Sequence, residues 1–275
     1  MSKPYAEVIG DPIAQSKSPV IHGFWLDRLG IDAEYHRAHV LSVDLPAYLE
    51  QRRADPAWRG CNVTMPHKQA IIPLLDRLDP IAARIGAVNT VVRNADGALI
   101  GRNTDAPGFI EPLLPALSGE NPPKRALVLG AGGAARAIVV ALADAGLAIT
   151  LAARDPAKAR ALLDELGVGH QAASLADFDR PGAQAYDLVV NASPLGMVGN
   201  PPLAFDLSHA NAIVYDIVTA PLITPLLTAA RAQGLRGIDG LTMLIGQGAV
   251  AFEHFFGASP PRADGDAELR ALLTA

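Results

Sequence analysis

Residues 126–136, Ala-Leu-Val-Leu-Gly-Ala-Gly-Gly-Ala-Ala-Arg, constrain the fold more than any other stretch of this chain. Four apolar residues, enough for a buried parallel strand, run directly into Gly130, Gly132 and Ala135, which fit the pattern G-x-G-x-x-G/A. The alanine-rich segment 134–145 follows and favours a helix. A strand, a glycine-rich turn and a helix in this order are typical of a dinucleotide-binding α/β unit.

Each position of this turn has its own physical role. Gly130 permits the tight strand-to-helix turn, Gly132 lets the backbone approach a pyrophosphate, and Ala135 is small enough for the helix to pack on the strand. The helix N-terminus then offers free N–H groups to phosphate oxygens. The alternative is a glycine-rich turn in an ordinary α/β domain. The residues predicted to contact the nucleotide here are Gly130, Ala131, Gly132, Gly133 and Ala134.

Apolar segments and helical patterns alternate along the whole chain, which predicts an α/β protein. Strands are expected at 6–10, 34–40, 61–64, from 86, 126–129, 149–153, 186–191 and 212–218. Helices are expected at 18–29, 43–53, 68–75, 134–145, 156–166, 224–233 and 241–256, and from about 266. Residues 118–124, Ser-Gly-Glu-Asn-Pro-Pro-Lys, have the composition of a linker.

Composition excludes several classes of protein. The 275 residues carry a net charge of −5, which argues against nucleic acid or an anionic membrane as the main partner. Cys61 is the one cysteine, which fits a reducing cytoplasm, and no Cys/His cluster has the spacing of a metal site. The N-terminus lacks the apolar core of a signal peptide, and no apolar run is long enough to span a membrane.

Seven motifs together make the chain similar to the shikimate dehydrogenase family. They are residues 10–19 (GDPIAQSKSP), 60–68 (GCNVTMPHK), 86–90 (GAVNT), 101–105 (GRNTD), 130–134 (GAGGA), 191–197 (NASPLGM) and 240–247 (GLTMLIGQ). Each motif is modest alone, but their order and their spread over most of the chain are specific.

The resemblance implies an N-terminal α/β substrate-binding domain and a Rossmann-type, doubly wound dinucleotide-binding domain. We place the first at 1–105 plus 240–275 and the second at 106–239. It also implies the reversible reduction of 3-dehydroshikimate to shikimate by NADPH, in aromatic amino acid biosynthesis. Shikimate and 3-dehydroshikimate would be the small-molecule partners, and the protein would be a cytoplasmic monomer or homodimer.

The resemblance also assigns the substrate contacts residue by residue. Ser16 and Ser18 would hold the substrate carboxylate, in a loop whose only cation is Lys17. The alternative for Ser18 is a plain helix cap, with Pro19 at the first helical position. Paired donors and acceptors suit a ring that bears several hydroxyl groups. The residues expected around that ring are Thr64, Asn89, Asp105, Thr219 and Gln247.

Lys68 matches the catalytic lysine of the family, and Asp105 matches its carboxylate partner. A lysine beside the reacting oxygen can stabilise a developing alkoxide and supply its proton. From the residues alone, Lys68 would be a solvated helix lysine and Asp105 an N-cap. The resemblance favours the catalytic roles.

Three positions depart from the family pattern. Gln15 stands where a histidine often precedes the first serine, and Thr242 stands for a glycine in the last motif. Thr219 replaces a tyrosine that usually lies close to substrate and nicotinamide, so it keeps a hydroxyl but loses reach. This leaves the substrate preference open.

The end of the second nucleotide-domain strand bears on the choice of cofactor. Arg154 and Lys158 fall on or next to the two basic positions of NADP-dependent members, and Ala153 replaces an asparagine. An NAD enzyme usually places an acid near this point, and Asp155 is a candidate. Two cations against one carboxylate favour NADP. The remaining residues expected at the cofactor are Ile217 and Gly240.

Two other hypotheses stay open at this point. One is a quinate/shikimate dehydrogenase that prefers NAD, suggested by Asp155 and Thr219. The other is a non-catalytic shikimate-binding regulator on the same fold, against which the retained Lys68 and Asp105 argue, because binding alone needs no proton donor.

Overall fold

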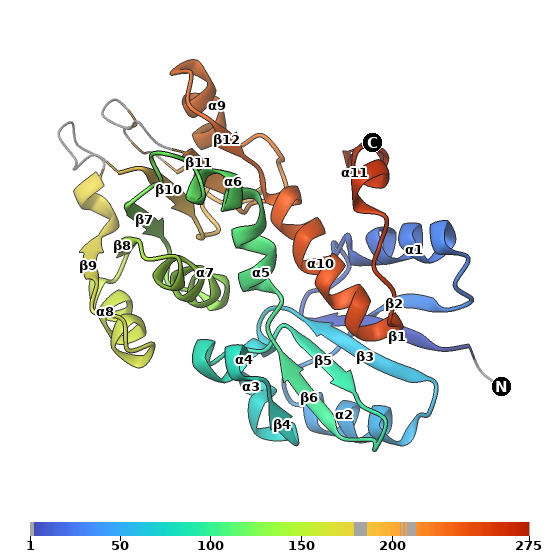
Figure 1. The fold of residues 1–275 in the computed structure, drawn as a ribbon. Coiled ribbons are helices and arrows are strands. Elements are labelled where there is room, and N and C mark those ends of the chain that lie inside the picture. The colour runs from blue at the N-terminus through green and yellow to red at the C-terminus, as the bar shows by residue number, and fades with distance from the viewer. Residues whose placement is uncertain (1–2, 179–185, 204, 206, 208–212, 275) are drawn as a thin grey trace. The chain divides into compact units, whose positions relative to one another are not determined.

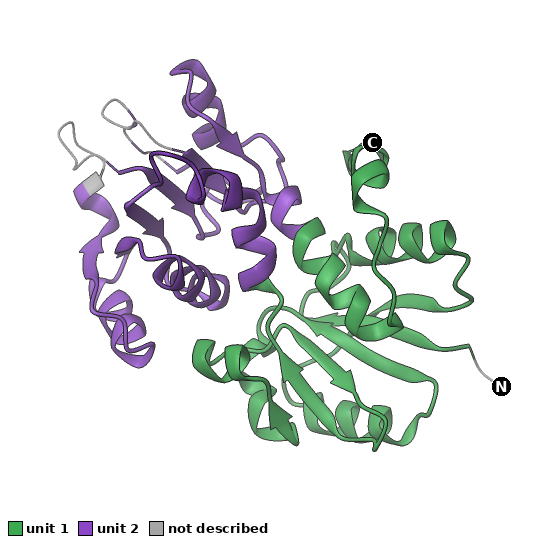
Figure 2. Ribbon diagram, viewed as in Figure 1, with its two compact units in different colours: residues 1–105, 245–275 green, residues 106–244 purple. Residues whose placement is uncertain are grey.

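The structure is a computed structural model that describes residues 3–178, 186–203, 205, 207 and 213–274. The chain divides into two compact units: Met1–Asp105 with Ile245–Ala275 form unit 1, and Ala106–Leu244 form unit 2 (Figure 2). Each unit contains a six-stranded sheet with helices packed against it (Figure 1). The predicted α/β fold class is confirmed.

Unit 1 is built on a mixed sheet with the strand order β2-β1-β3-β5-β6-β4. The β1·β2, β1·β3 and β4·β6 pairs are parallel, whereas β3·β5 and β5·β6 are antiparallel. The antiparallel register sets Thr90 opposite both Asn62 and Arg102. The strands are β1 (Tyr5–Gly10), β2 (Glu34–His39), β3 (Trp58–Val63), β4 (Arg77–Leu78), β5 (Thr90–Arg93) and β6 (Leu99–Arg102).

Most helices of unit 1 lie where the sequence predicts them, but the one expected after β3 differs clearly. The single helix expected at 68–75 is a short helix, α3 (His67–Ala70), followed by a 3₁₀ turn at Ile72–Leu74. Pro73 lacks the N–H that a continuing helix needs, so the helix cannot extend to Leu75. The other helices are α1 (Ser18–Leu29), α2 (Leu45–Ala54), α4 (Pro80–Ile85), α10 (Gly240–Phe256, shared with unit 2) and α11 (Arg262–Thr274).

Two further differences in unit 1 have local causes. Helix α4 was not predicted, although Asp79 accepts a hydrogen bond from the backbone N–H of Ala82 at 2.7 Å and Pro80 opens the helix, a recognisable start signal. The last helix begins at Arg262 rather than at about 266, and Arg262 pairs with Asp266 one turn later, at 2.8 Å.

Unit 2 has the strand order β9-β8-β7-β10-β11-β12, and every pair in it is parallel. In order of sequence this is 3-2-1-4-5-6, the order of a Rossmann fold, and the strand order reverses between β7 and β10. The predicted dinucleotide-binding topology is therefore present. The strands are β7 (Arg125–Leu129), β8 (Ala148–Ala153), β9 (Gln171–Ser174), β10 (Leu188–Asn191), β11 (Ile213–Asp216) and β12 (Gly237–Ile238).

Sequence analysis did not predict the two edge strands of unit 2, β9 and β12. Strand β9 has the sequence Gln-Ala-Ala-Ser, and β12 contains only Gly237 and Ile238, so neither forms an apolar run. Ala212, the expected start of the strand seen as β11, lies outside the described residues. The helices are α5 (Asp105–Ile110), α6 (Leu114–Leu117), α7 (Gly133–Asp144), α8 (Pro156–Glu165) and α9 (Pro225–Ala232), with 3₁₀ turns at Glu111–Leu113 and Leu175–Phe178.

The linker-like segment 118–124 lies inside unit 2, where it connects α6 to β7. The boundary between the units falls at Asp105, the last residue of unit 1 and the first residue of α5, which is also where the predicted first domain, 1–105, ends. The proline and glycine residues of segment 118–124 therefore mark a connection within unit 2 and not a boundary between the units.

A buried aromatic cluster forms one part of the core of unit 1. The imidazole of His22 stacks on Tyr35 with ring centroids 4.0 Å apart and meets Trp25 edge-on at 5.7 Å. Among the described residues, neither ring nitrogen of His22 has a hydrogen-bond partner. Burial lowers the pKa of His22 to about 3, so the ring is neutral in the folded protein.

This burial predicts a loss of stability in mild acid. Below its usual pKa of about 6.5 the histidine of the unfolded chain binds a proton, whereas His22 in the folded chain stays neutral down to about pH 3. Stability is therefore lost as pH falls from 6.5 towards 3, by about 2 kcal/mol at pH 5 from this group. His22→Phe keeps an aromatic ring and should remove that loss.

Urea unfolding of both proteins at pH 7 and pH 5 measures the effect. Trp25 and Trp58, the two tryptophans of the chain, are both buried in unit 1, so tryptophan fluorescence reports the unfolding of that unit. An equal loss of stability on acidification in wild type and variant would contradict the assignment.

Candidate active site

The centre of the candidate site is a buried ion pair between Lys68 and Asp105. The Lys68 Nζ atom lies 2.5 Å from Asp105 Oδ2, and the side chains are 16% and 8% exposed. Lys68 is the second residue of α3, and its carbonyl accepts the N–H of Val88 at 2.8 Å, which ties α3 to the segment before β5. The interpretation of Lys68 as a solvated helix lysine is therefore wrong.

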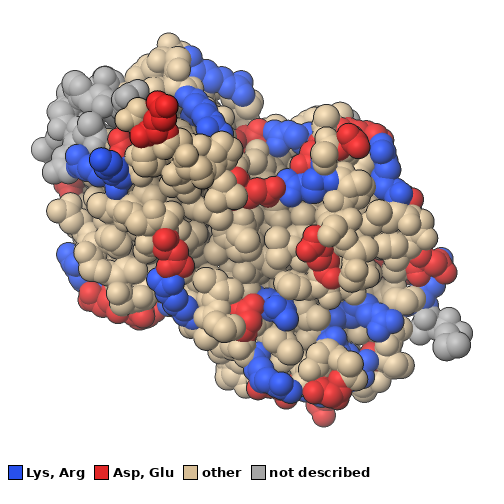
Figure 3. Space-filling model, viewed as in Figure 1, with Lys and Arg blue, Asp and Glu red and all other residues tan. Residues whose placement is uncertain are grey.

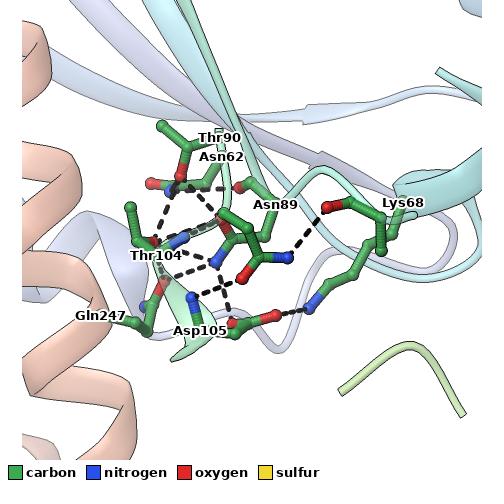
Figure 4. Close-up of polar contacts among 9 residues, drawn as sticks. Asn62, Lys68, Asn89, Thr90, Thr104, Asp105 and Gln247 are labelled. Atoms are coloured by element: carbon green, nitrogen blue, oxygen red, sulfur yellow. Dashed lines mark hydrogen bonds and ion pairs between the residues drawn. The ribbon is translucent and has the colours of Figure 1, made fainter. Parts of the chain in front are cut away.

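Asn89 holds the other oxygen of the Asp105 carboxylate. Its Nδ2 atom donates to Asp105 Oδ1 at 2.9 Å, while its Oδ1 atom accepts the backbone N–H of Thr104 at 2.7 Å (Figure 4). Because a backbone N–H can only donate, it fixes which end of the Asn89 amide faces Asp105. Both oxygens of Asp105 are thus engaged by side chains from outside α5, beyond what an N-cap requires.

Gln247 on α10 closes this cluster. Its Oε1 atom lies 3.4 Å from Thr104 Oγ1 and 3.5 Å from Asn89 Nδ2 (Figure 4). Thr64 directly follows β3, and its carbonyl accepts the N–H of His67 at the start of α3 at 2.9 Å. The structure thus brings Lys68, Asn89, Asp105 and Gln247 into contact, with Thr64 on the segment that leads to Lys68.

Ser16 and Ser18 face each other at the start of α1. Their Oγ atoms are 3.3 Å apart, and the N–H of Ser18 donates to Ser16 Oγ at 3.3 Å. Ser18 is the first residue of the helix, after Lys17 at the N-cap position, and no side-chain hydrogen bond caps this helix. The interpretation of Ser18 as a plain helix cap is therefore wrong.

Sequence analysis missed the residue that anchors this serine loop. Nε and Nη2 of Arg37 both donate to the carbonyl of Ser16, at 2.9 and 2.6 Å. Lys17, the one cation noted in the loop, donates instead to the carbonyl of Leu273 in α11 at 2.6 Å. Arg37 lies on β2, and His39, two residues on, contacts Asp11 at 2.7 Å. The sequence signal for this anchor was the pair Arg37 and His39, because residues two positions apart on a strand point to the same face.

Unit 2 carries the features predicted for a nucleotide. Gly130 follows β7 with φ +110°, and a Cβ there would lie 2.9 Å from the backbone of Ala192, which follows β10. Gly132 is the N-cap of α7, and the space beside it is open. Ala135 is fully buried, as the packing of the helix on the sheet requires. The turn therefore stands at the point where the strand order reverses.

The end of β8 presents two cations and one carboxylate that caps the next helix. Asp155 is the N-cap of α8, and its Oδ1 atom accepts the N–H of Ala157 at 3.0 Å. Arg154 and Lys158 are exposed, and within the described part of the chain neither forms an ion pair. Ala153, the last residue of β8, is buried and offers no polar side chain.

The segment after β11 holds the remaining predicted residues. Ile217 and Thr219 lie here, both partly buried. A Cβ on Gly240, at the start of α10, would lie 2.4 Å from the carbonyl oxygens of Ile217 and Val218, so this position requires glycine for packing. The contacts of Ile217, Thr219 and Gly240 with any ligand stay predictions.

A buried polar cluster fixes the start of that segment. Asp216 is fully buried and accepts hydrogen bonds from Thr224 Oγ1 at 2.6 Å, Asn191 Nδ2 at 3.0 Å and the N–H of Val218 at 3.1 Å. Burial raises the pKa of Asp216 above its usual value, against these hydrogen bonds. Asn191 thereby ties the end of β10 to the end of β11.

Other kinds of site are not evident in the described residues. No three His, Cys, Asp or Glu side chains there lie close enough to hold a metal ion. None of the described helices is both long and apolar enough to cross a membrane. On the face drawn in Figure 3, basic and acidic side chains lie in small mixed groups over the surface.

Comparisons with known proteins agree with this geometry. Residues 8–91 match the shikimate dehydrogenase substrate binding domain, and residues 240–270 match the shikimate 5′-dehydrogenase C-terminal domain. A relative named shikimate dehydrogenase (NADP⁺), from Sphingopyxis alaskensis, is 56% identical over 277 residues, which cover 100% of this chain and 98% of that protein.

Two solved structures are similar to this chain over nearly its whole length. Shikimate 5-dehydrogenase from Thermus thermophilus, in complex with NADP(H) and shikimate, is 38% identical with a TM-score of 0.82, over 98% of this chain and 99% of that one. Quinate dehydrogenase from Corynebacterium glutamicum, in complex with NAD, is 33% identical with a TM-score of 0.83, over 99% of both chains.

The fold and the site define a two-unit α/β protein in which one unit has Rossmann topology and the other holds a buried lysine–aspartate pair. With these matches over its whole length, the chain belongs to the shikimate dehydrogenase family.

The role of Arg37 can be tested without any ligand. Arg37→Gln shortens the side chain and removes the paired hydrogen bonds to Ser16, which at this exposed position together contribute about 1 kcal/mol. We expect the backbone amides of residues 13–18 to exchange with solvent about 5-fold faster in the variant. Hydrogen–deuterium exchange with peptide resolution measures this.

Arg53→Gln is the matched control, because Arg53 is also an exposed arginine of unit 1 but pairs with Asp76. Exchange in the serine loop should be unchanged in this control. A loop that exchanges equally in wild type and Arg37→Gln would remove Arg37 as its anchor.

Proposed function

We propose that this protein catalyses the reversible reduction of 3-dehydroshikimate to shikimate with NADPH. The observation that carries the proposal is the buried Lys68–Asp105 pair oriented by Asn89. A lysine held in place by a carboxylate suits proton transfer to a carbonyl oxygen. The relatives named above as NADP-dependent shikimate dehydrogenases support the same reaction.

The turn after β7 has the shape that a dinucleotide requires. We propose that Gly130, Ala131, Gly132, Gly133 and Ala134 contact the pyrophosphate at the N-terminus of α7, with Ile217 and Gly240 also in the cofactor site. The open space at Gly132 and the left-handed backbone of Gly130 fit this assignment. NADPH supplies the hydride when bound.

Lys68 then acts on the oxygen of the reacting carbonyl. As negative charge develops on that oxygen, the ammonium stabilises it and donates a proton, which leaves a neutral amine. In the oxidising direction the amine accepts the proton of the substrate hydroxyl. Asp105 holds the ammonium at 2.5 Å and balances its charge in a largely buried position.

We propose that the substrate is held at two ends. The facing hydroxyls of Ser16 and Ser18 bind its carboxylate, in a loop anchored by Arg37. The ring hydroxyls are matched by side chains that both donate and accept hydrogen bonds. These are Thr64, Asn89, Asp105, Thr219 and Gln247.

The residues at the end of β8 favour NADP over NAD as the cofactor. The alternative that prefers NAD depended on Asp155 as a partner for the ribose 2′-hydroxyl, but this carboxylate caps α8. Arg154 and Lys158 carry positive charge without ion-pair partners in the described residues, which suits a 2′-phosphate. A regulator that only binds shikimate would not need the buried Lys68–Asp105 pair.

We also propose a cytoplasmic location and a monomeric or homodimeric state. Cys61 is the one cysteine and its thiol is buried, which is consistent with a reducing compartment. Analytical ultracentrifugation distinguishes the two oligomeric states.

The catalytic role of Lys68 predicts a particular kinetic result. Lys68→Ala removes the cation beside the reacting oxygen but leaves the serine loop and Asn89 in place. Since general acid–base catalysis contributes about 10²–10⁴-fold, kcat should fall by that factor while the KM for shikimate changes only a few-fold. Lys68→Arg should not restore kcat, because a guanidinium keeps its proton near neutral pH.

Steady-state oxidation of shikimate measures both parameters. Gln69→Ala, an exposed position next along α3, is the matched control and should leave both unchanged. If Lys68→Ala kept most of its kcat, the lysine would be a substrate anchor and the proton donor would lie elsewhere.

Arg154 should distinguish NADPH from NADH. Arg154→Ala removes a cation that can bind the 2′-phosphate, which NADH lacks, so the KM for NADPH should rise while that for NADH stays nearly constant. A hydrogen bond to a charged group is worth about 1.5–3 kcal/mol, or roughly 10- to 100-fold. Arg160→Ala on the same helix α8, where Arg160 donates to the carbonyl of His170, should change neither value. Equal effects of Arg154→Ala on both cofactors would rule out the assignment.

A further inference from the structure

A chain of buried hydrogen bonds runs from the aromatic core of unit 1 to the carboxylate of Asp105. The Tyr35 hydroxyl donates to Asn62 Oδ1 at 2.6 Å, and Asn62 Nδ2 donates to Thr90 Oγ1 at 3.1 Å. The Thr90 hydroxyl donates to Asn89 Oδ1 at 3.0 Å, and Asn89 Nδ2 donates to Asp105 Oδ1 at 2.9 Å. Figure 4 shows the part of this chain from Asn62 to Lys68.

The direction of these bonds is determined at the Asn89 end. The N–H of Thr104 can only donate, so Asn89 Oδ1 faces Thr104 and Thr90 while Asn89 Nδ2 faces Asp105. Thr90 accepts from Asn62, and the nearer acceptor for its own hydroxyl proton is Asn89 Oδ1 at 3.0 Å. Thr104 Oγ1 lies farther away, 3.3 Å from Thr90 Oγ1, and is itself placed to donate to Asn89 Oδ1 at 3.3 Å. Each member therefore donates towards Asp105.

The chain is closed off from solvent. Asn62, Asn89 and Thr90 are at most 6% exposed, and Thr90 is fully buried. In such surroundings successive hydrogen bonds polarise one another, by about 10–30% per bond. A donor to the oxygen of the Asn89 amide thus strengthens the bond from its nitrogen to Asp105.

We propose that Thr90 and Asn62 are positioning residues for proton transfer: through Asn89 they hold Asp105, and so Lys68, in the reactive geometry. This inference rests on the proposed function. Neither residue was singled out from the sequence, although both lie within matched motifs. The antiparallel pairing of β3 with β5, which places Asn62 opposite Thr90, makes the arrangement possible.

Thr90→Val tests the proposal, because valine has nearly the shape of threonine but lacks the hydroxyl. We expect kcat for shikimate oxidation to fall about 5-fold, equivalent to ~1 kcal/mol, with KM within about 2-fold of wild type. Thr90→Ser keeps the hydroxyl and should restore kcat. Unchanged kcat in Thr90→Val, or an equal loss in Thr90→Ser, would overturn the proposal.

A double-mutant cycle separates positioning from general damage to the fold. Asp105→Asn removes the carboxylate on which the chain ends, so adding Thr90→Val to it should change the residual single-turnover rate less than about 2-fold. If the same 5-fold loss recurred in that background, Thr90 would act on stability or on another group, and the proposal would fail.

A second pair of variants keeps the test open if Thr90→Val does not fold. Tyr35→Phe and Tyr48→Phe each remove one buried hydroxyl from unit 1, but Tyr48 donates to Glu7 at 2.7 Å, away from the chain. Only Tyr35→Phe should lower kcat, by about 2- to 3-fold for the weakened relay. Equal kcat values for the two variants would overturn the proposal.

The activity of the wild-type protein distinguishes a failure of the proposed function from a failure of the positioning proposal. Absence of shikimate oxidation by the wild type would reject the proposed function itself. An active wild type whose Thr90 and Tyr35 variants are equally active would reject only the positioning chain.

Discussion

The Lys68–Asp105 ion pair is the interaction on which the rest of unit 1 depends, because two charges are held in a nearly buried position. Removing charges from water is unfavourable unless geometry and further hydrogen bonds compensate. Here Asn89 satisfies the second carboxylate oxygen, and the backbone of Thr104 orients Asn89. The mixed sheet supplies these groups, since the β3·β5·β6 pairing sets Asn62, Thr90 and the segment after Arg102 side by side.

In unit 2, close packing of backbone at two glycines shapes the candidate cofactor site. Gly130 adopts a left-handed φ and packs against the backbone of Ala192 where the strand order reverses, and Gly240 packs against the carbonyls of Ile217 and Val218. Glycine is required at both positions because any Cβ would meet backbone atoms. The buried Asp216 and its partners then fix the segment after β11. Unit 2 thus presents backbone N–H groups at the start of α7, and hydrogen bonds of Asp216 join the ends of β10 and β11.

One hydrogen bond of Asp155 changes the interpretation of the segment after β8. Read as a sequence, Arg-Asp-Pro-Ala-Lys offered both a base for a phosphate and an acid for a ribose hydroxyl. In the structure the backbone N–H of Ala157 donates to the carboxylate of Asp155. Asp155 is thus the N-cap of the helix that begins with Pro156, a position where aspartate is common. Arg154 and Lys158 are therefore the groups that we propose to decide the choice of cofactor.

The sequence by itself determined the α/β class and the Rossmann unit, and it pointed to Lys68, Asn89 and Asp105 as candidate site residues. These are encoded locally, in apolar runs, in the glycines after β7 and in short motifs around Lys68, Asn89 and Asp105. Only the tertiary structure decided how these residues are bonded. Lys68 and Asp105 are 37 positions apart, and the bonds of Thr90 and Arg37 cross between strands or from a strand to a loop. No local pattern encodes such contacts, because register and packing between distant segments create them.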